Sequence, residues 1–260
     1  MQVETLIAAV GKPDCAFLDD MRIQTDAVVI DQCGEESTAV LDRNGHSVVF
    51  CCTRKTGVGP SRNQALARAM GDILLFADED LVYVDGYAEL LQAAFAARPQ
   101  ADVIVFNIRS KRPRRSIRRP SRVRWFNYMR YGAARIAARR ASVERADLRF
   151  SGEFGGGGRY GSGEDTIFLH DCLRRGLRIY AVPLMLASTD DADSSWFHGY
   201  DARFFADKGA LMAAIYGRLG SLFCWALVLR HPEYRESGFS FLERLRRMRA
   251  GLRDYLEGDR

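Results

Sequence analysis

The sequence lacks a hydrophobic run long enough to cross a membrane. The apolar run near its C-terminus, Leu219–Leu229, is eleven residues long and contains Gly220 and Ser221, so it is too short to span a bilayer. The N-terminal region has Glu4 where a signal peptide carries Lys or Arg, and the run Leu6–Val10 is too short for a signal core. We therefore expect a cytoplasmic protein, with any membrane association peripheral and on the inner face.

Cysteine motifs are also missing. The chain has six cysteines and none of them form a C-x-x-C pair, which favours reduced thiols over disulfides or a zinc site. The hydrophobic content of 47% is ordinary, so it excludes a disordered chain and a multispanning membrane protein. A length of 260 residues suits one large domain, or one domain with an appendage.

Acidic residues are absent from a long stretch in the middle of the chain. None occurs between Asp102 and Glu144, and within this stretch the segment 109–140 is rich in arginine. Aromatic residues interleave with the arginines: Trp125, Phe126, Tyr128 and Tyr131. Such a segment suits nucleic acid, or an anionic membrane surface and a lipid-diphosphate-linked acceptor. The basic amphipathic pattern of Phe239–Leu256 favours the membrane surface, and nucleic acid stays as the alternative.

Short apolar runs alternate with helical patterns in the first hundred residues. The runs predict strands at Thr5–Val10, Ala27–Ile30, Ser47–Cys51, Ile73–Ala77 and Asp102–Phe106, and the helical patterns cover Pro60–Met70 and Tyr87–Arg98. Unbroken, β-branched runs of this kind are typical of parallel strands covered by helices on both faces. The sequence therefore predicts an α/β fold with a mostly parallel, doubly wound sheet.

Two of the predicted strands end in acidic residues. Asp31 follows the second strand, and Asp78-Glu79-Asp80 follows the fourth. Ligands of such sheets bind beyond the carboxyl ends of the strands. Asp78 and Asp80 are two residues apart, so in extended geometry they share a face and suit Mg²⁺ or Mn²⁺ on a diphosphate. The alternative is that Asp80 or Asp85 caps the helix that begins near Tyr87.

A glycine-rich stretch, Gly155–Gly163, leads directly into Glu164-Asp165 and a further helical pattern, Thr166–Arg175. A loop of this composition can order over a bound donor or serve as a plain linker, and both interpretations stay open. The two acids likewise suit either chemistry or the capping of a helix N-terminus.

Three ordered motifs resemble glycosyltransferase family 2. The string SRNQALARAMGDILLFADED, from Ser61 to Asp80, is similar to the family's helix and strand before its D-x-D, and SGEDTIFLHDCLRRG is similar to its (G)ED motif. The later SSWFHGYDARFFADKGAL resembles a subgroup that makes capsular or surface polysaccharide. The resemblance covers roughly residues 3–215. It implies a GT-A domain over 1–215, with a nucleotide-binding half (1–108), an acceptor-binding half (109–215) and a helical C-terminal extension (216–260).

On the donor side, the resemblance implies that Asp31 contacts uracil or ribose and that Arg62 lies near the nucleotide. Asp78 would contact ribose or the metal, with Glu79 beside it, and Asp80 would hold Mn²⁺ or Mg²⁺ against the diphosphate. The sequence departs from the family pattern in this region. The first strand ends in 10–13 (VGKP) instead of P-x-Y-N, and Asp31 is followed by 32–34 (QCG). The nucleotide is therefore the weakest part of the resemblance.

On the acceptor side, Asp165 matches the family's catalytic base and Glu164 lies beside it. An ordinary Asp titrates near about 3.9, so we expect Asp165 to be ionised at neutral pH. His198 follows the base helix, where a histidine often completes the metal coordination; a surface or packed His is the alternative.

These roles imply a metal-dependent inverting transferase. It would move a sugar from a UDP-sugar to a glycan or lipid-linked acceptor in surface polysaccharide synthesis. A non-catalytic homologue is the remaining alternative, and retention of Asp78, Asp80 and Asp165 argues against it.

Overall fold

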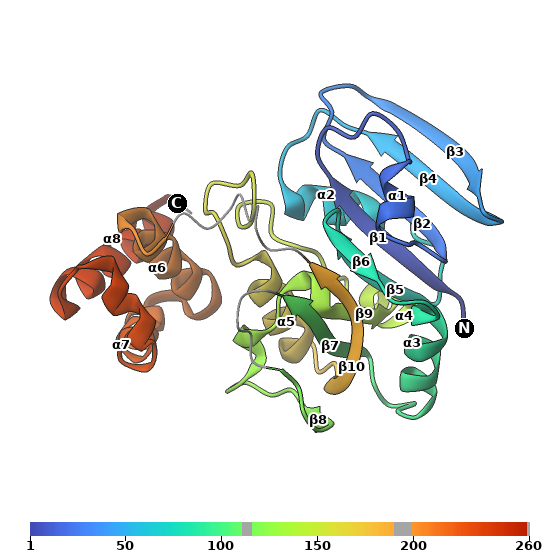
Figure 1. The fold of residues 1–260 in the computed structure, drawn as a ribbon. Coiled ribbons are helices and arrows are strands. Elements are labelled where there is room, and N and C mark those ends of the chain that lie inside the picture. The colour runs from blue at the N-terminus through green and yellow to red at the C-terminus, as the bar shows by residue number, and fades with distance from the viewer. Residues whose placement is uncertain (111–115, 190–198, 259–260) are drawn as a thin grey trace.

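The computed structural model describes residues 1–110, 116–189 and 199–258. They form a ten-stranded sheet with strand order β3-β4-β2-β1-β5-β9-β7-β10-β6, and β8 pairs with β10 (Figure 1). The strands are β1 (Val3–Ala9), β2 (Asp26–Asp31), β3 (Ser37–Arg43), β4 (His46–Cys52), β5 (Ile73–Asp78), β6 (Leu81–Tyr83), β7 (Val103–Ser110), β8 (Ser121–Arg122), β9 (Ile136–Arg139) and β10 (Ile179–Thr189). The helices are α1 (Phe17–Asp20), α2 (Val58–Leu66), α3 (Tyr87–Ala96), α4 (Arg140–Arg145), α5 (Glu164–Arg174), α6 (Ala202–Tyr216), α7 (Gly220–Arg230) and α8 (Phe241–Gly258), with short 3₁₀ turns between several of them.

The predicted parallel strands form one half of the sheet. β4, β2, β1 and β5 pair in parallel, and four of the five predicted runs lie within or beside one of them, while the fifth, Asp102–Phe106, lies in β7. Their side chains contribute to apolar cores on both faces of the sheet, α3 packing on one and α2 on the other. The register places Asp31 opposite Ala9 and Asp78 opposite Ala8, so both acids lie at the same edge of the sheet.

The rest of the sheet contains one further parallel pair, β7 with β10, and several antiparallel pairs, which make the sheet mixed. β3 forms a hairpin with β4 across Asn44 and Gly45, and all but one of its residues are exposed. β9 lies between β5 and β7 and is antiparallel to both. The predicted α/β class is confirmed, while these antiparallel strands were not expected from the sequence.

The arginine-rich segment divides into an exposed part and a buried part. Trp125 and Phe126 are exposed, whereas Tyr128 and Tyr131 are buried in the core beneath α5. Arg135 is only 4% exposed, and its Nε donates to the carbonyl of Phe106 at 2.7 Å. The segment is therefore not one continuous interface, because its second half belongs to the sheet and its core.

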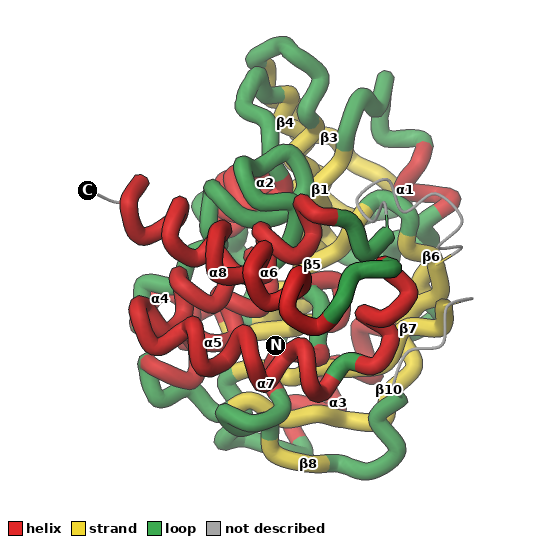
Figure 2. The backbone as a smooth tube through the Cα atoms, turned by 90° about the vertical axis from the view of Figure 1, so that its left-hand side faces the viewer, coloured by secondary structure: helices red, strands yellow, loops and turns green. Residues whose placement is uncertain are grey.

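The C-terminal helices α6, α7 and α8 pack together beside the sheet domain (Figures 1 and 2). At the α6–α8 crossing, a Cβ on Gly209 would meet the carbonyl oxygen of Met248 at 1.8 Å, and one on Gly251 would meet that of Ala206 at 2.0 Å. Only glycine permits this approach. The apolar face of α8 is therefore buried against α6, and the helical unit begins at Ala202, before the predicted boundary at 216.

An 18-residue window within Ala202–Arg230 has a mean hydropathy of 1.6, so this stretch is long and apolar enough to cross a membrane, unlike the shorter run Leu219–Leu229 on which the sequence-based expectation rested. The stretch does not form one straight helix. Gly217 has a φ of 56° at the end of α6, and α7 packs back so that Gly220 lies against the backbone of Met212. Part of this stretch is buried as the core of the helical unit.

Candidate active site

Arg62 lies at the centre of the candidate site. It projects from α2, whose first turn packs so closely on the loop after Phe150 that a Cβ on Gly59 would meet the carbonyl oxygen of Ser151 at 2.0 Å. The Arg62 side chain is 3% exposed; its Nη2 donates to Asp78 Oδ1 at 2.5 Å and its Nη1 to Glu164 Oε1 at 2.8 Å. One guanidinium thus joins the end of β5 to the start of α5.

The charge of Arg62 is stabilised by these two carboxylates. Burial opposes the charge, but Asp78 and Glu164 outweigh it and raise the pKa of Arg62 above its ordinary value. The guanidinium also lies over the ring of Phe150, 5.3 Å from the ring centre. Arg62 and Glu164 are therefore engaged with each other, and Asp78 is held by the same side chain.

Asp165 begins α5 next to this ion-pair cluster. Its Oδ1 accepts a hydrogen bond from the Thr166 backbone N–H. Burial, and then the neighbouring charge of Glu164, raise the pKa of Asp165 to about 6, while Lys208 and Arg62 act in the opposite direction. The pKa of Asp165 is therefore higher than that of an ordinary Asp, because of a burial that the sequence did not show. A pKa near 6 still leaves most of the carboxyl groups ionised at neutral pH, and it makes the ionised form a stronger base.

Lys208 reaches the same site from the helical unit, and sequence reasoning missed this residue. Its Nζ lies 3.4 Å from the hydroxyl of Ser162 and 5.4 Å from the ring centre of Phe204. Burial lowers the pKa of Lys208, and the charges of Asp165 and Glu164 oppose that shift. A lysine on α6 therefore shares the electrostatic environment of the predicted base, so the helical unit is part of the site.

A second group of polar residues lies at the ends of β1 and β2. Asp31 is fully buried; its Oδ1 accepts a hydrogen bond from the Lys12 backbone N–H, and its Oδ2 has no hydrogen-bond partner in the described structure. Glu79 turns toward these residues, because its Oε2 accepts from the Val10 N–H at 2.8 Å and lies 3.5 Å from Lys12 Nζ. The departure from the family pattern at 10–13 therefore places Lys12 between two predicted donor-site acids.

Asp78 and Asp80 engage different neighbours. Asp78 Oδ1 is held by Arg62, whereas Asp80 Oδ2 accepts from the Thr189 hydroxyl at 2.7 Å. Each carboxylate keeps a second oxygen for which the described structure gives no hydrogen bond. Two such oxygens fit a hard divalent ion that takes its other ligands from a diphosphate. His198, the third predicted ligand, lies outside the described residues.

Cysteine also lies near the donor side of the site. The potential ligand atoms of Asp31, Cys33 and Cys52 lie within 4.8 Å of one another, which is the one such group found in the described part of the chain. Thiol ligands select soft metals, whereas Mg²⁺ and Mn²⁺ prefer oxygen. This group therefore does not replace Asp78 and Asp80 as the predicted metal site.

The glycine-rich loop packs against the site in a defined conformation. The Gly156 carbonyl accepts from the Val58 N–H at 2.8 Å. Gly155 has a φ of 97°, and a Cβ there would lie 2.7 Å from Glu164 Oε2. The glycines thus let the loop pass directly over Glu164. Neither a loop that orders over a bound donor nor a plain linker requires this contact.

A cavity of about 510 Å³ lies away from these residues, at the opposite ends of the strands. Pro99, Asp102, Arg145 and Arg178 are among the residues that line it. It contains no predicted site residue, so we place the candidate site by its charged side chains and not by cavity size.

Comparison with known proteins identifies a family segment and a similar fold. Residues 24–148 match the family model "Glycosyl transferase family 2", which includes Asp31, Arg62, Asp78 and Asp80. The fold is similar to that of S. aureus TarS 1–349 in complex with UDP-GlcNAc, with a TM-score of 0.62 and 16% identity over 99% of this chain and 92% of that one. The complex of the same protein with UDP gives a TM-score of 0.61 and 16% identity over 89% and 72% of the two chains.

No curated protein sequence matches the chain significantly. At 16% identity the TarS structures show the fold alone, and the family model covers only the segment that carries the donor-side motifs. The predicted resemblance and fold are both confirmed: residues 24–148 are a glycosyltransferase family 2 segment, and the chain as a whole has the GT-A fold.

Proposed function

We propose that this protein is an inverting glycosyltransferase that moves a sugar from a nucleotide-diphosphate donor to a hydroxyl of a glycan or lipid-linked acceptor. The observation that best supports this proposal is the position of Asp165. It begins α5 beside an ion-pair cluster that also includes the end of β5, where the family's donor motif lies. A base with a pKa of about 6 is well matched to take a proton from a hydroxyl at neutral pH.

The roles within the cluster follow from its contacts. Asp165 would accept the proton of the acceptor hydroxyl as that oxygen attacks the anomeric carbon and the nucleoside diphosphate leaves from the opposite face. Glu164 and Arg62 would position this carboxylate and the end of β5, since Arg62 bonds to both Glu164 and Asp78. Lys208 would limit the rise in the pKa of Asp165.

The donor would lie across the ends of β1, β2 and β5. Asp31 Oδ2 is an acceptor without a partner, as a site for a base or ribose donor group requires. UDP is the first nucleotide to test, because the similar TarS structures contain UDP and UDP-GlcNAc. A divalent ion held by Asp78 and Asp80 would neutralise charge on the leaving diphosphate.

Hydrolysis and transfer assays test this function. Purified protein is incubated with UDP-, GDP- and dTDP-sugars, with Mn²⁺ or with EDTA, and release of the nucleoside diphosphate is measured. We expect release from one donor class, lost in EDTA and in Asp80→Asn. Equal release in EDTA would remove the metal from the proposal. No binding or turnover of any donor would favour the non-catalytic homologue.

We also propose that the enzyme acts in cell-surface polysaccharide synthesis, in the cytoplasm at the inner face of the membrane. The arginine-rich, acid-free stretch supports this placement, because an anionic surface attracts it.

A further inference from the structure

Helix α7 carries an apolar face that no other part of the described structure covers. Its buried residues, Gly220, Cys224 and Val228, repeat every fourth position and point into the helical unit. Leu222 and Leu229 lie on the opposite side and are 65% and 70% exposed. A helix that is apolar on all sides is normally buried, so this outward face requires an apolar neighbour.

A chain of aromatic rings connects α7 to the exposed part of the arginine-rich segment. Phe223 stacks on Tyr216 with ring centres 3.7 Å apart, and the Tyr216 hydroxyl lies 3.1 Å from that of Tyr128. His170 lies 6.1 Å from Tyr216 and 5.4 Å from Trp125. Trp125 is 53% exposed, so these largely buried rings join the exposed face of α7 to the exposed residues beside β8. Figures 1 and 2 place α7 and β8 toward the same lower side of the molecule.

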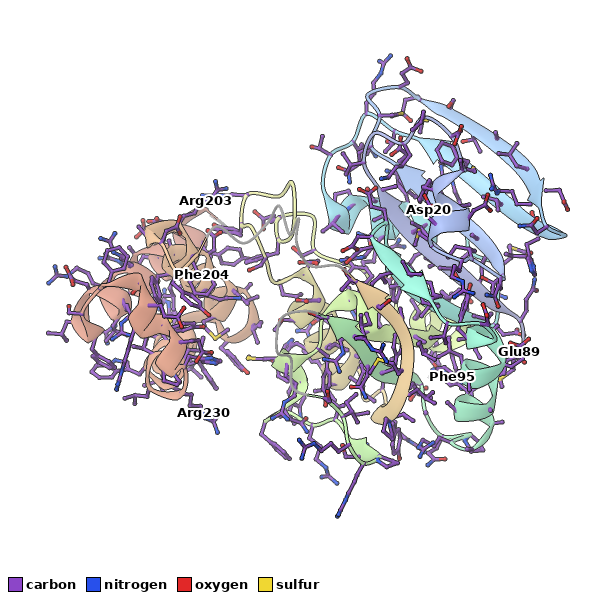
Figure 3. The ribbon with its side chains drawn as sticks, in the orientation of Figure 1. Asp20, Glu89, Phe95, Arg203, Phe204 and Arg230 are labelled. Carbon is purple, nitrogen blue, oxygen red and sulfur yellow. The ribbon has the colours of Figure 1, made fainter. Side chains whose placement is uncertain are left out.

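The two segments that form this face, α7 and the residues around Trp125, carry charge of one sign. No acid occurs in the sequence between Asp207 and Glu233, just as none occurs between Asp102 and Glu144. Exposed arginines flank the apolar residues: Arg118, Arg119, Arg122, Arg124, Arg218 and Arg230. Figure 3 shows Arg230 at the lower end of the helical unit. Two segments far apart in the sequence thus contribute arginines and exposed apolar side chains to one face.

We infer that this face, formed by α7 together with Trp125 and Phe126, docks on the surface of an anionic lipid bilayer. Leucine and aromatic side chains would enter the headgroup and acyl boundary, and the arginines would contact lipid phosphates. The apolar face of α8 cannot do this, because it is buried against α6. The inference rests on the proposed function only for its setting, since vesicle binding needs no donor or acceptor.

Sedimentation with vesicles tests the docking face. Wild-type protein should sediment with vesicles of phosphatidylcholine and phosphatidylglycerol, much less with phosphatidylcholine alone, and less as salt rises. The double substitution Leu222→Glu/Leu229→Glu should weaken partitioning on the order of 10–100-fold, because it places charge in the boundary layer. Val40→Glu is the matched control: Val40 is 69% exposed, but it lies on the edge strand β3. That variant should bind like wild type.

Several results would overturn the inference. One is equal vesicle binding by the double variant and by Val40→Glu; another is absence of wild-type binding to anionic vesicles. A dimer that the double substitution dissociates, in protein that ignores vesicles, would assign the face to a second copy of this chain. A shift of RNA without vesicle binding would assign it to nucleic acid. If the double variant melts early, Leu222→Gln/Leu229→Gln replaces it. Calorimetry with UDP, run on every variant, reports the donor site separately from docking.

Discussion

The two groups of acids at the candidate site differ in how their charges are compensated. The first group, which we call the transfer cluster, consists of Arg62, Asp78, Glu164 and Asp165. Arg62 is bonded to both Asp78 and Glu164, and the charge of Lys208 lowers the pKa of Asp165. On the donor side, the buried Asp31 has one oxygen with no hydrogen-bond partner in the described structure. Buried polar groups are nearly always paired, so an exception calls for a ligand or another explanation. Arg62 Nε also has no partner in the described structure, so the contrast concerns the carboxylates. Asp78 and Glu164 are paired with a cation before substrate arrives, whereas Asp31 would gain its second partner from the donor.

The largest expected effect belongs to Asp165. Asp165→Asn should reduce sugar transfer on the order of 10²–10⁴-fold, since an amide cannot take the acceptor proton. UDP affinity should stay near wild type, because Asp165 is not among the donor-side residues. The melting temperature should not fall, as the substitution removes a buried charge whose pKa the fold raises. Asp171→Asn, on the same helix, is the control. Near wild-type transfer by Asp165→Asn would mean that Glu164 and Asp165 only cap the N-terminus of α5 and that neither is the base.

Arg62 tests whether the transfer cluster is held by its ion pairs. Arg62→Gln leaves Glu164 buried without its cation, so we expect a loss of about 3 kcal/mol in the free energy of unfolding. Urea denaturation measures it. Arg68→Gln, an exposed arginine just beyond α2, should change stability by less than about 0.5 kcal/mol. Equal stability of the two variants would contradict the view that the cluster is organised before substrate binds.

Asp31 tests the other side of the comparison. Asp31→Asn presents an amide to the donor where the wild type presents an acceptor oxygen, so UDP affinity should fall on the order of 10–100-fold. The protein should stay folded, since Oδ1 can still accept from the Lys12 N–H. Asp26→Asn, at the opposite end of β2, should leave the affinity unchanged in the same calorimetry. Unchanged affinity in Asp31→Asn would mean that the unpartnered oxygen does not face the nucleotide.

The smallest effect is that of pH. A base acts when it is ionised, and the raised pKa of Asp165 places its titration near pH 6. The transfer rate should therefore fall about tenfold from pH 7 to pH 5 and change little above pH 7. Lys208→Met should move the midpoint upward, because Lys208 lowers the pKa of Asp165. A profile that is flat between pH 5 and 7 would remove Asp165 as the titrating group.

The sequence predicted the parallel half of the fold well, because strands such as β5 are short, unbroken apolar runs. It also placed Asp31 and Asp78 at one edge, since both follow parallel strands. It did not predict β9, which has the sequence IAAR and forms only because β5 and β7 flank it. Strand propensity does not identify a strand that forms because its neighbours pair with it.

The sequence predicted the acidic residues of the candidate site but not the basic residues with which they pair. The sequence predicted a role for Asp165 and Glu164, but it could not show that Glu164 faces Arg62 from more than a hundred positions away. It also could not show Lys208, because a lysine on an amphipathic helix normally faces solvent. Burial and long-range contact decide both features, and neither has a local signature.

If the α7 face docks on a bilayer and Asp165 is the base, as we propose, helix α6 determines how far an acceptor must extend. Lys208, beside the base, and Tyr216, at the edge of the docking face, are eight residues apart on this helix, or about 12 Å along its axis. The headgroup layer of a leaflet is only about 5–8 Å thick. A hydroxyl buried among the headgroups would therefore stop short of Asp165, whereas one carried on a longer glycan would reach it. The length of the acceptor, as well as its chemistry, becomes a condition for transfer.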